Sequence, residues 1–177
     1  MQRWTRVPLW SGVATVVAGS VAGGVMMLAP GGAAAMGQSV VPECTKANLS
    51  AKYKGGDAGM SHVYGRIILR NVSEDTCFVK GYGGLSYVGR GNGTQIGAPA
   101  DRTPSATPKT VLEPGDKVRS AVSETSAAPY PKKVCRPTKV DGFRVYAPDE
   151  THAFFIAHPT MGCANPKVHL LEHKAYR

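Results

Sequence analysis

Apolar and polar side chains alternate with a period of two along most of the chain after residue 40. In the segment 62–70, Val63, Ile67 and Leu69 share one face, while arginines occupy the other. Such alternation is typical of β-strands that bury one face. No window of helical length shows apolar residues at a spacing of 3.6. The pattern therefore predicts a protein built from about eight or nine short strands.

Turn residues divide the predicted strands into hairpins. The glycine-rich segment 55–59 predicts a turn between strands at 48–54 and 62–71. A second hairpin is predicted around Asp149, which lies in a Pro-Asp-Glu sequence between two β-like segments. These hairpins set which residues face one another across the turn.

Two segments rich in Ser, Thr, Ala and Pro, 99–109 and 123–133, are predicted to be long loops between strands. Strands and loops of this kind over about 140 residues favour an all-β fold, a two-sheet sandwich with Greek-key connections. Both tryptophans lie near the N-terminus, so the predicted domain lacks the buried Trp of antibody-like domains.

Residues 1–35 are typical of an export signal. Two arginines precede an uncharged segment, 7–30, rich in Val, Ala, Gly and Met, and small residues end at Ala35. We expect cleavage after Ala35, which leaves one domain over 36–177. The alternative is an uncleaved membrane anchor, because the uncharged segment is long enough to span a bilayer.

All four cysteines lie in the predicted domain: Cys44, Cys77, Cys135 and Cys163. An even number in an exported chain predicts two disulfides, and no two cysteines have the C-x-x-C spacing of a redox or zinc site. A hairpin centred on Asp149 places Cys135 opposite Cys163. The glycine-rich hairpin brings Cys44 near Cys77. We predict the pairs Cys44–Cys77 and Cys135–Cys163.

Short motifs follow one another in order over most of the predicted domain. They are CTKANLS at 44–50, LRNVS at 69–73, Gly81-Tyr82, GAPA at 97–100, LEPG at 112–115, CRP at 135–137, VYAP at 145–148 and the closing Cys163. The ordered set resembles the domain of unknown function DUF4232, common in secreted proteins and lipoproteins of actinobacteria. The resemblance implies an exported, immunoglobulin-like β-sandwich with no established activity and no catalytic residues.

The formal net charge is +9 at pH 7, and residues 36–177 keep +7 once the two arginines of the leader are removed. Four cations crowd around Cys135, and we call this cluster the basic loop: Lys132, Lys133, Arg136 and Lys139. A disulfide at Cys135 would hold the loop in place, so the pattern predicts an anion-binding site. The alternative is a solvated loop that adds only solubility.

Nucleic acid is excluded as a partner because the other basic residues are dispersed along the sequence and no aromatic ladder accompanies them. Catalysis is not expected either. Ser86 lies in a sequence close to a nucleophile elbow, but Val88 stands where that turn requires a second glycine.

A second class of function is metal handling. The candidate ligands are His158, Met161, His169 and His173. Imidazole and thioether groups suit copper, but a disulfide would consume the nearby Cys163, and histidines on strand faces are usually surface or packed side chains. We therefore predict no cofactor and keep an extracytoplasmic copper-binding protein as the alternative.

The sequence as a whole predicts an exported, non-enzymatic binding module of the cell envelope. Its expected partners are an anionic cell-wall polymer or lipid headgroups, which would bind at the basic loop. A structural role in contact with another envelope protein is a further alternative.

Overall fold

The computed structural model describes residues 40–177. The predicted export signal, its cleavage after Ala35 and the alternative membrane anchor lie outside these residues. Within 40–177, the structure contains no helix of sufficient length and apolar character to cross a membrane.

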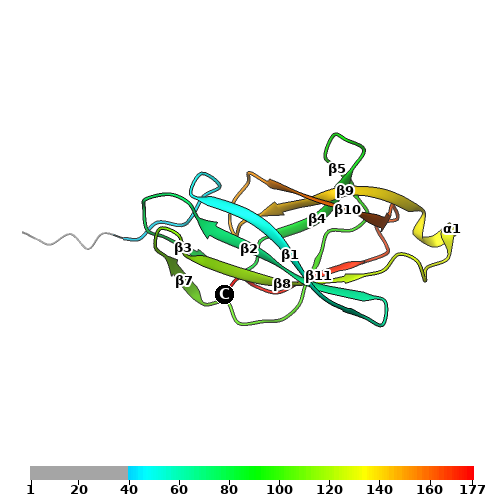
Figure 1. Cartoon of the computed structure of the whole chain (residues 1–177), viewed down its shortest axis with the longest axis horizontal. Helices are drawn as coiled ribbons and strands as arrows, with labels where there is room; N and C mark the ends of the chain where they lie inside the picture. Colours follow the sequence, from blue (N-terminus) through cyan, green and yellow to red (C-terminus); the bar gives the residue numbers. More distant parts are fainter. Residues whose placement is uncertain (1–39) are drawn as a thin grey trace, which may run out of the picture. The chain divides into compact units, whose positions relative to one another are not determined.

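Five strands form the first sheet (Figure 1). In spatial order they are β1 (Leu49–Gly59), β2 (His62–Asn71), β8 (Lys117–Thr125), β11 (Leu171–His173) and β6 (Asp101–Arg102). All neighbours are antiparallel except β11 and β6. The C-terminal residues continue along β8, because the Lys174 amide donates to the Ala121 carbonyl and Arg177 exchanges two backbone hydrogen bonds with Arg119.

Four strands form the second sheet, and two more form a short ribbon. The second sheet has the order β10 (Phe154–Cys163), β9 (Pro137–Tyr146), β4 (Gly84–Gly89) and β5 (Thr94–Ile96). The ribbon pairs β3 (Cys77–Lys80) with β7 (Lys109–Leu112). The described residues contain one helical turn, α1 (Lys132–Cys135), so the prediction of an all-β chain is confirmed.

The two larger sheets share one hydrophobic core. Ile67, Leu69 and Val118 face inward from the first sheet, and Phe143 and Val145 face inward from the second; each is almost fully buried. These are the alternate positions that the period-two pattern assigns to one face of each strand. The apolar alternation therefore predicted which faces of the strands are buried.

Both predicted disulfides are present. Cys44 pairs with Cys77 and joins the segment before β1 to β3, while Cys135 pairs with Cys163 and joins α1 to the end of β10. All four cysteines are buried. In the β9–β10 hairpin Cys163 pairs with Pro137, two residues from the position that a hairpin centred on Asp149 gives. One residue of this displacement is already present next to the turn, and the β-bulge between Ala157 and Thr160 adds the other.

The predicted turn at 55–59 is wrong. The glycines belong to β1, and the turn lies at Met60 and Ser61, which have φ angles of 48° and 64°. Across the hairpin, Gly65 has a packing role, because the Tyr53 phenol occupies the space that a Cβ at Gly65 would need. Glycine here permits close packing against a ring and does not make the turn.

The predicted loop at 123–133 is also shorter than expected. Strand β8 continues to Thr125, and α1 begins at Lys132. The strand continues through polar residues because Glu124 occupies an inward position and finds hydrogen-bond partners in the core. An inward carboxylate is therefore the feature that the sequence pattern did not predict.

Candidate functional site

The basic loop spans α1 and the first residues of β9. The helical turn begins after Pro131 and ends at Arg136, whose φ of 54° stops the helix. Cys135 is fully buried in its disulfide, while all four basic side chains are exposed. None of the four forms an ion pair with any residue in the part of the chain that the structure describes. The loop is therefore an anchored, unneutralised group of cations.

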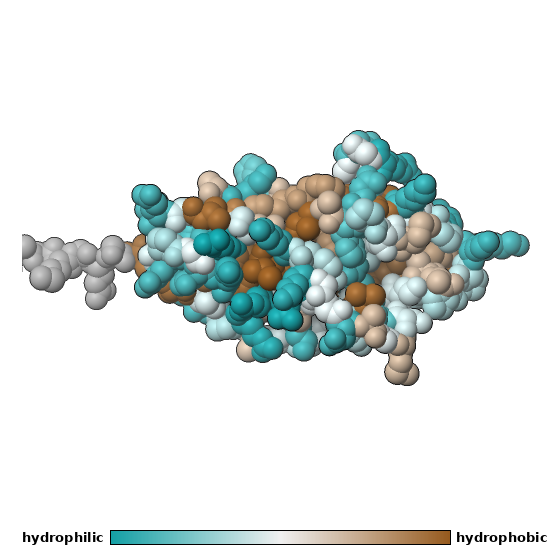
Figure 2. Space-filling model, viewed as in Figure 1, coloured by the Kyte–Doolittle hydropathy of each residue, from teal (hydrophilic) through white to brown (hydrophobic). Residues whose placement is uncertain are grey.

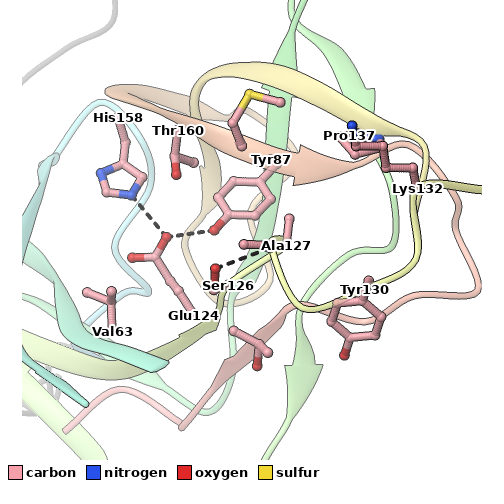
Figure 3. A pocket seen from close by; sticks show the side chains of 13 residues that line it. Val63, Tyr87, Glu124, Ser126, Ala127, Tyr130, Lys132, Pro137, His158 and Thr160 are labelled. Atoms are coloured by element: carbon pink, nitrogen blue, oxygen red, sulfur yellow. Dashed lines mark hydrogen bonds and ion pairs between the residues drawn. The ribbon is translucent and has the colours of Figure 1, made fainter. Parts of the chain in front are cut away.

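A cavity of about 640 Å³ opens beside the basic loop (Figure 3). Its walls come from β2, the end of β8, the segment before α1 and the second half of β10. Most of the lining is apolar, including Val63, Ala127, Pro137 and Met161. Lys132 also lines the cavity, so this residue belongs both to the basic loop and to the cavity wall.

The Glu124 carboxylate lies at the wall of this cavity and is only 5% exposed. Its Oε1 accepts a hydrogen bond from the Tyr53 hydroxyl at 2.5 Å. Its Oε2 accepts one from the Tyr87 hydroxyl at 2.6 Å and is 2.9 Å from the His158 Nε2 (Figure 3). We call these four side chains the Glu124 network. It joins β1 and β8 of the first sheet to β4 and β10 of the second.

Aromatic stacking holds the partners of Glu124 in place. The rings of His158 and Phe143 stack with centroids 4.5 Å apart, and those of Tyr87 and Phe143 stack at 5.4 Å. Because β10, β9 and β4 are neighbouring strands, the three rings form a ladder across the second sheet. Tyr53 from the first sheet contacts Phe143 at 5.1 Å. The donors are thereby held in position around the Glu124 carboxylate.

The protonation states of the Glu124 network follow from opposing effects on the pKa values of its members. Burial alone would raise the pKa of Glu124, but hydrogen bonds from His158, Tyr53 and Tyr87 outweigh it and lower that pKa. Burial, together with the adjacent carboxylate, raises the pKa of Tyr53 and of Tyr87. At neutral pH the carboxylate is therefore ionised and both phenols keep their protons. The cavity has an anionic wall at Glu124 and a cationic rim at Lys132.

The candidate copper ligands have other partners. The His158 Nε2 contacts Glu124, and the His169 Nδ1 lies 2.9 Å from an Asp101 carboxylate oxygen. His173 is buried beside Ser120, and Met161 is about half exposed. Among residues 40–177, no group of three or more His, Cys, Asp or Glu side chains could hold a metal ion.

His173 leads to a prediction about pH. Burial, and secondly the charge of Arg102, lower the pKa of His173 to about 4, against 6.5 for an ordinary histidine. The folded state therefore keeps His173 neutral, while the unfolded chain takes up a proton below pH 6.5. Stability should fall as the pH decreases from about 6.5 to 4, by at most about 3 kcal/mol, and this contribution should level off below pH 4.

Urea denaturation across this pH range measures the effect. His173→Gln should show a smaller loss of stability between pH 6.5 and 4 than the wild type. Lys167→Gln, which removes an exposed cation that forms no ion pair among residues 40–177, serves as the control and should keep the wild-type dependence. Equal pH dependence in all three proteins would mean that His173 is not the group responsible.

The fold and these contacts define a small β protein stabilised by two buried disulfides, which suggest an oxidising, extracytoplasmic environment. Residues 44–174 match the family described as "Domain of unknown function (DUF4232)", and the chain belongs to this family. The resemblance found in the sequence motifs is thus confirmed. No curated protein and no solved structure matches the chain.

Sequence reasoning missed three members of the Glu124 network. Of its four side chains, only His158 was a candidate, and for a different role. The available signal was the inward series Val118, Ser120, Val122 and Glu124, in which alternation places a carboxylate on the core side. A buried carboxylate requires hydrogen-bond partners, but the sequence alone does not show which strands supply them.

Proposed function

We propose that the chain is an exported, non-enzymatic binding module that binds an anionic ligand of the cell envelope at the α1 end. The observation that carries this proposal is the double role of Lys132, which belongs to the basic loop and lines the cavity. Figure 3 places Lys132 and Glu124 at opposite sides of the cavity. An anionic group would bind at the rim beside Lys132, away from the Glu124 carboxylate.

Export is supported by the predicted leader and by the two disulfides, which persist in oxidising compartments. Two facing sheets with non-sequential strand order support the finer assignment of an immunoglobulin-like, Greek-key sandwich. The family resemblance favours an actinobacterial envelope as the setting. The predicted compartment, the fold and the positive charge therefore all support an exported binding module.

Cell-wall polymers are the favoured ligands. The first described residues lie at the end of the molecule that carries β3 and β7, whereas α1 lies at the other end (Figure 1). In the alternative in which the leader remains as a membrane anchor, a domain tethered near residue 40 would thus present its basic loop away from the membrane. Lipid headgroups and another envelope protein are the alternative partners for the same surface.

Replacing the basic loop tests the proposal. The variant Lys132→Ser, Lys133→Ser, Arg136→Ser, Lys139→Ser should bind isolated cell walls about tenfold more weakly, because four exposed contacts of a few tenths of a kcal/mol each add up to about 1.4 kcal/mol. Co-sedimentation with walls and, separately, with membranes measures the affinity. Stronger wild-type binding to membranes would assign lipid headgroups as the ligand.

The control removes the same charge elsewhere. It replaces four exposed cations with serine, Lys46, Lys80, Arg90 and Lys109. This control should bind walls nearly as well as the wild type. If the basic-loop variant and the control bind equally well, the basic loop is not the contact.

A further inference from the structure

Six basic residues from three separate strands, two on each strand, share one face of the first sheet. Residues such as Tyr53, Ile67 and Val118 face the core, so their neighbours along β1, β2 and β8 face outward. These outward positions define what we call the basic face: Lys52, Lys54, Arg66, Arg70, Lys117 and Arg119. All six side chains are exposed.

Strand register places like charges directly opposite one another. Lys54 pairs with Arg66 across β1 and β2, and Arg70 pairs with Lys117 across β2 and β8. Arg119 lies beside the C-terminal Arg177 through two backbone hydrogen bonds of 2.9 and 3.0 Å. Like charges at directly opposed positions destabilise a sheet. Because these like-charged pairs recur across neighbouring strands, we infer that the cations have a role other than stabilising the fold.

No acid neutralises these cations. Within the described residues, none of the six forms an ion pair. Asp57 at the bulged end of β1 is exposed but pairs with none of the six. The other exposed strand acids of this sheet, Glu172 and Asp101, lie on β11 and β6 toward the other edge, and Asp101 is already paired with His169. Figure 2 shows hydrophilic side chains gathered where β1, β2 and β8 lie in Figure 1. The surface therefore carries a strong positive field.

We propose that the basic face is a docking surface for a linear polyanion, a polymer with repeated phosphate or carboxylate groups. Arg66 and Arg70 on β2 are four residues apart, about 13 Å along the strand. The cations thus extend over more than one anionic group, as a repeating polymer requires. The outward apolar residue among them, Ile68, is only partly exposed, so the face offers charge and not an apolar patch for membrane insertion.

This inference shares with the proposed function the premise that the ligand is anionic, but it adds a second anion-binding surface that is separate from the basic loop. Long-chain polyphosphate serves as the probe, with orthophosphate as its single-group counterpart. The oxidised full chain is titrated by calorimetry over a range of salt concentrations. We expect polyphosphate to bind far more tightly than orthophosphate, because several groups bind at once.

The test variant removes two like-charged pairs: Lys54→Ser, Arg66→Ser, Arg70→Ser and Lys117→Ser. Its affinity for polyphosphate should fall by about tenfold or more, since four charge contacts are lost. The slope of log affinity against log salt should decrease in magnitude by about 3. The basic-loop variant and the control at Lys46, Lys80, Arg90 and Lys109 lose the same charge and should change both quantities much less.

Folding is checked in the same samples. Removing like-charged neighbours should leave the melting temperature unchanged or raise it, so weaker binding would not reflect unfolding. If the variant does unfold, the comparison of polyphosphate with orthophosphate on the wild type still tests the proposal. Equal affinity for the two would overturn it.

The remaining outcomes separate the two proposals. If the variant of the basic face binds polyphosphate as well as the control does, the docking surface is refuted, whatever the basic-loop variant does with cell walls. If the variant of the basic face alone loses both polyphosphate and walls, the docking surface stands and the basic loop is not the contact. Tighter wild-type binding to phosphatidylglycerol vesicles than to polyphosphate would assign the face to a membrane and overturn the polymer proposal.

Discussion

Glu124→Ala is expected to lower the free energy of unfolding by about 3–5 kcal/mol. The substitution removes the acceptor shared by Tyr53, Tyr87 and His158, and it leaves their donors without a partner in the core. A buried donor without an acceptor loses its hydration and gains nothing in return. Urea denaturation at pH 7 measures the change.

Two further variants serve as comparisons for the loss of stability expected in Glu124→Ala. Glu113→Ala removes an exposed carboxylate and should change stability by less than about 0.5 kcal/mol. Glu124→Gln keeps one acceptor oxygen and should be less destabilised than Glu124→Ala. A cost below about 1 kcal/mol for Glu124→Ala would show that the Glu124 network does not hold the sheets together.

The second large effect concerns the disulfide under the basic loop. Replacing Cys135 and Cys163 with alanine should destabilise the protein by about 3–4 kcal/mol, because the bond closes a loop with a sequence separation of 28. The same change frees α1 from β10. Limited proteolysis should therefore cut near residues 132–139 faster than in the wild type, and urea denaturation gives the loss of stability.

The other disulfide provides a matched control. Cys44 and Cys77 are separated by 33 residues, so replacing them with alanine should cost a similar amount of stability. This control should leave proteolysis at 132–139 unchanged when the two proteins are compared at equal stability. If both variants expose the basic loop equally, the Cys135–Cys163 bond has no special role in positioning it.

Local patterns in the sequence predicted much of the fold. Alternation identified the buried faces of β2, β8 and β9 because the period of a strand is fixed by its geometry. Approximate hairpin geometry predicted both disulfides, although the first turn lies at Met60 and Ser61 and the register at Cys163 is displaced by two residues from Cys135. These predictions succeed because each depends on residues in or directly beside one hairpin, where an error of one or two residues in the turn still leaves the two cysteines close.

The features that were missed depend on contacts between hairpins. The partners of Glu124 come from β1, β4 and β10, and their approach follows from how the two sheets pack. The cations of the basic face are dispersed along the sequence, and the register of β1, β2 and β8 brings them together. Gly65 was missed for a different reason: the Tyr53 ring that it accommodates lies on the paired strand of the same hairpin, and the sequence does not show that ring and glycine meet.

Binding of an anionic envelope ligand is tested most directly by co-sedimentation of the oxidised protein with isolated cell walls, and separately with membranes, across a salt series. We expect binding that saturates at low salt and weakens as salt rises, since exposed charges are screened over about 10 Å at 0.1 M. Protein that stays in the supernatant at low salt would contradict an anionic envelope ligand.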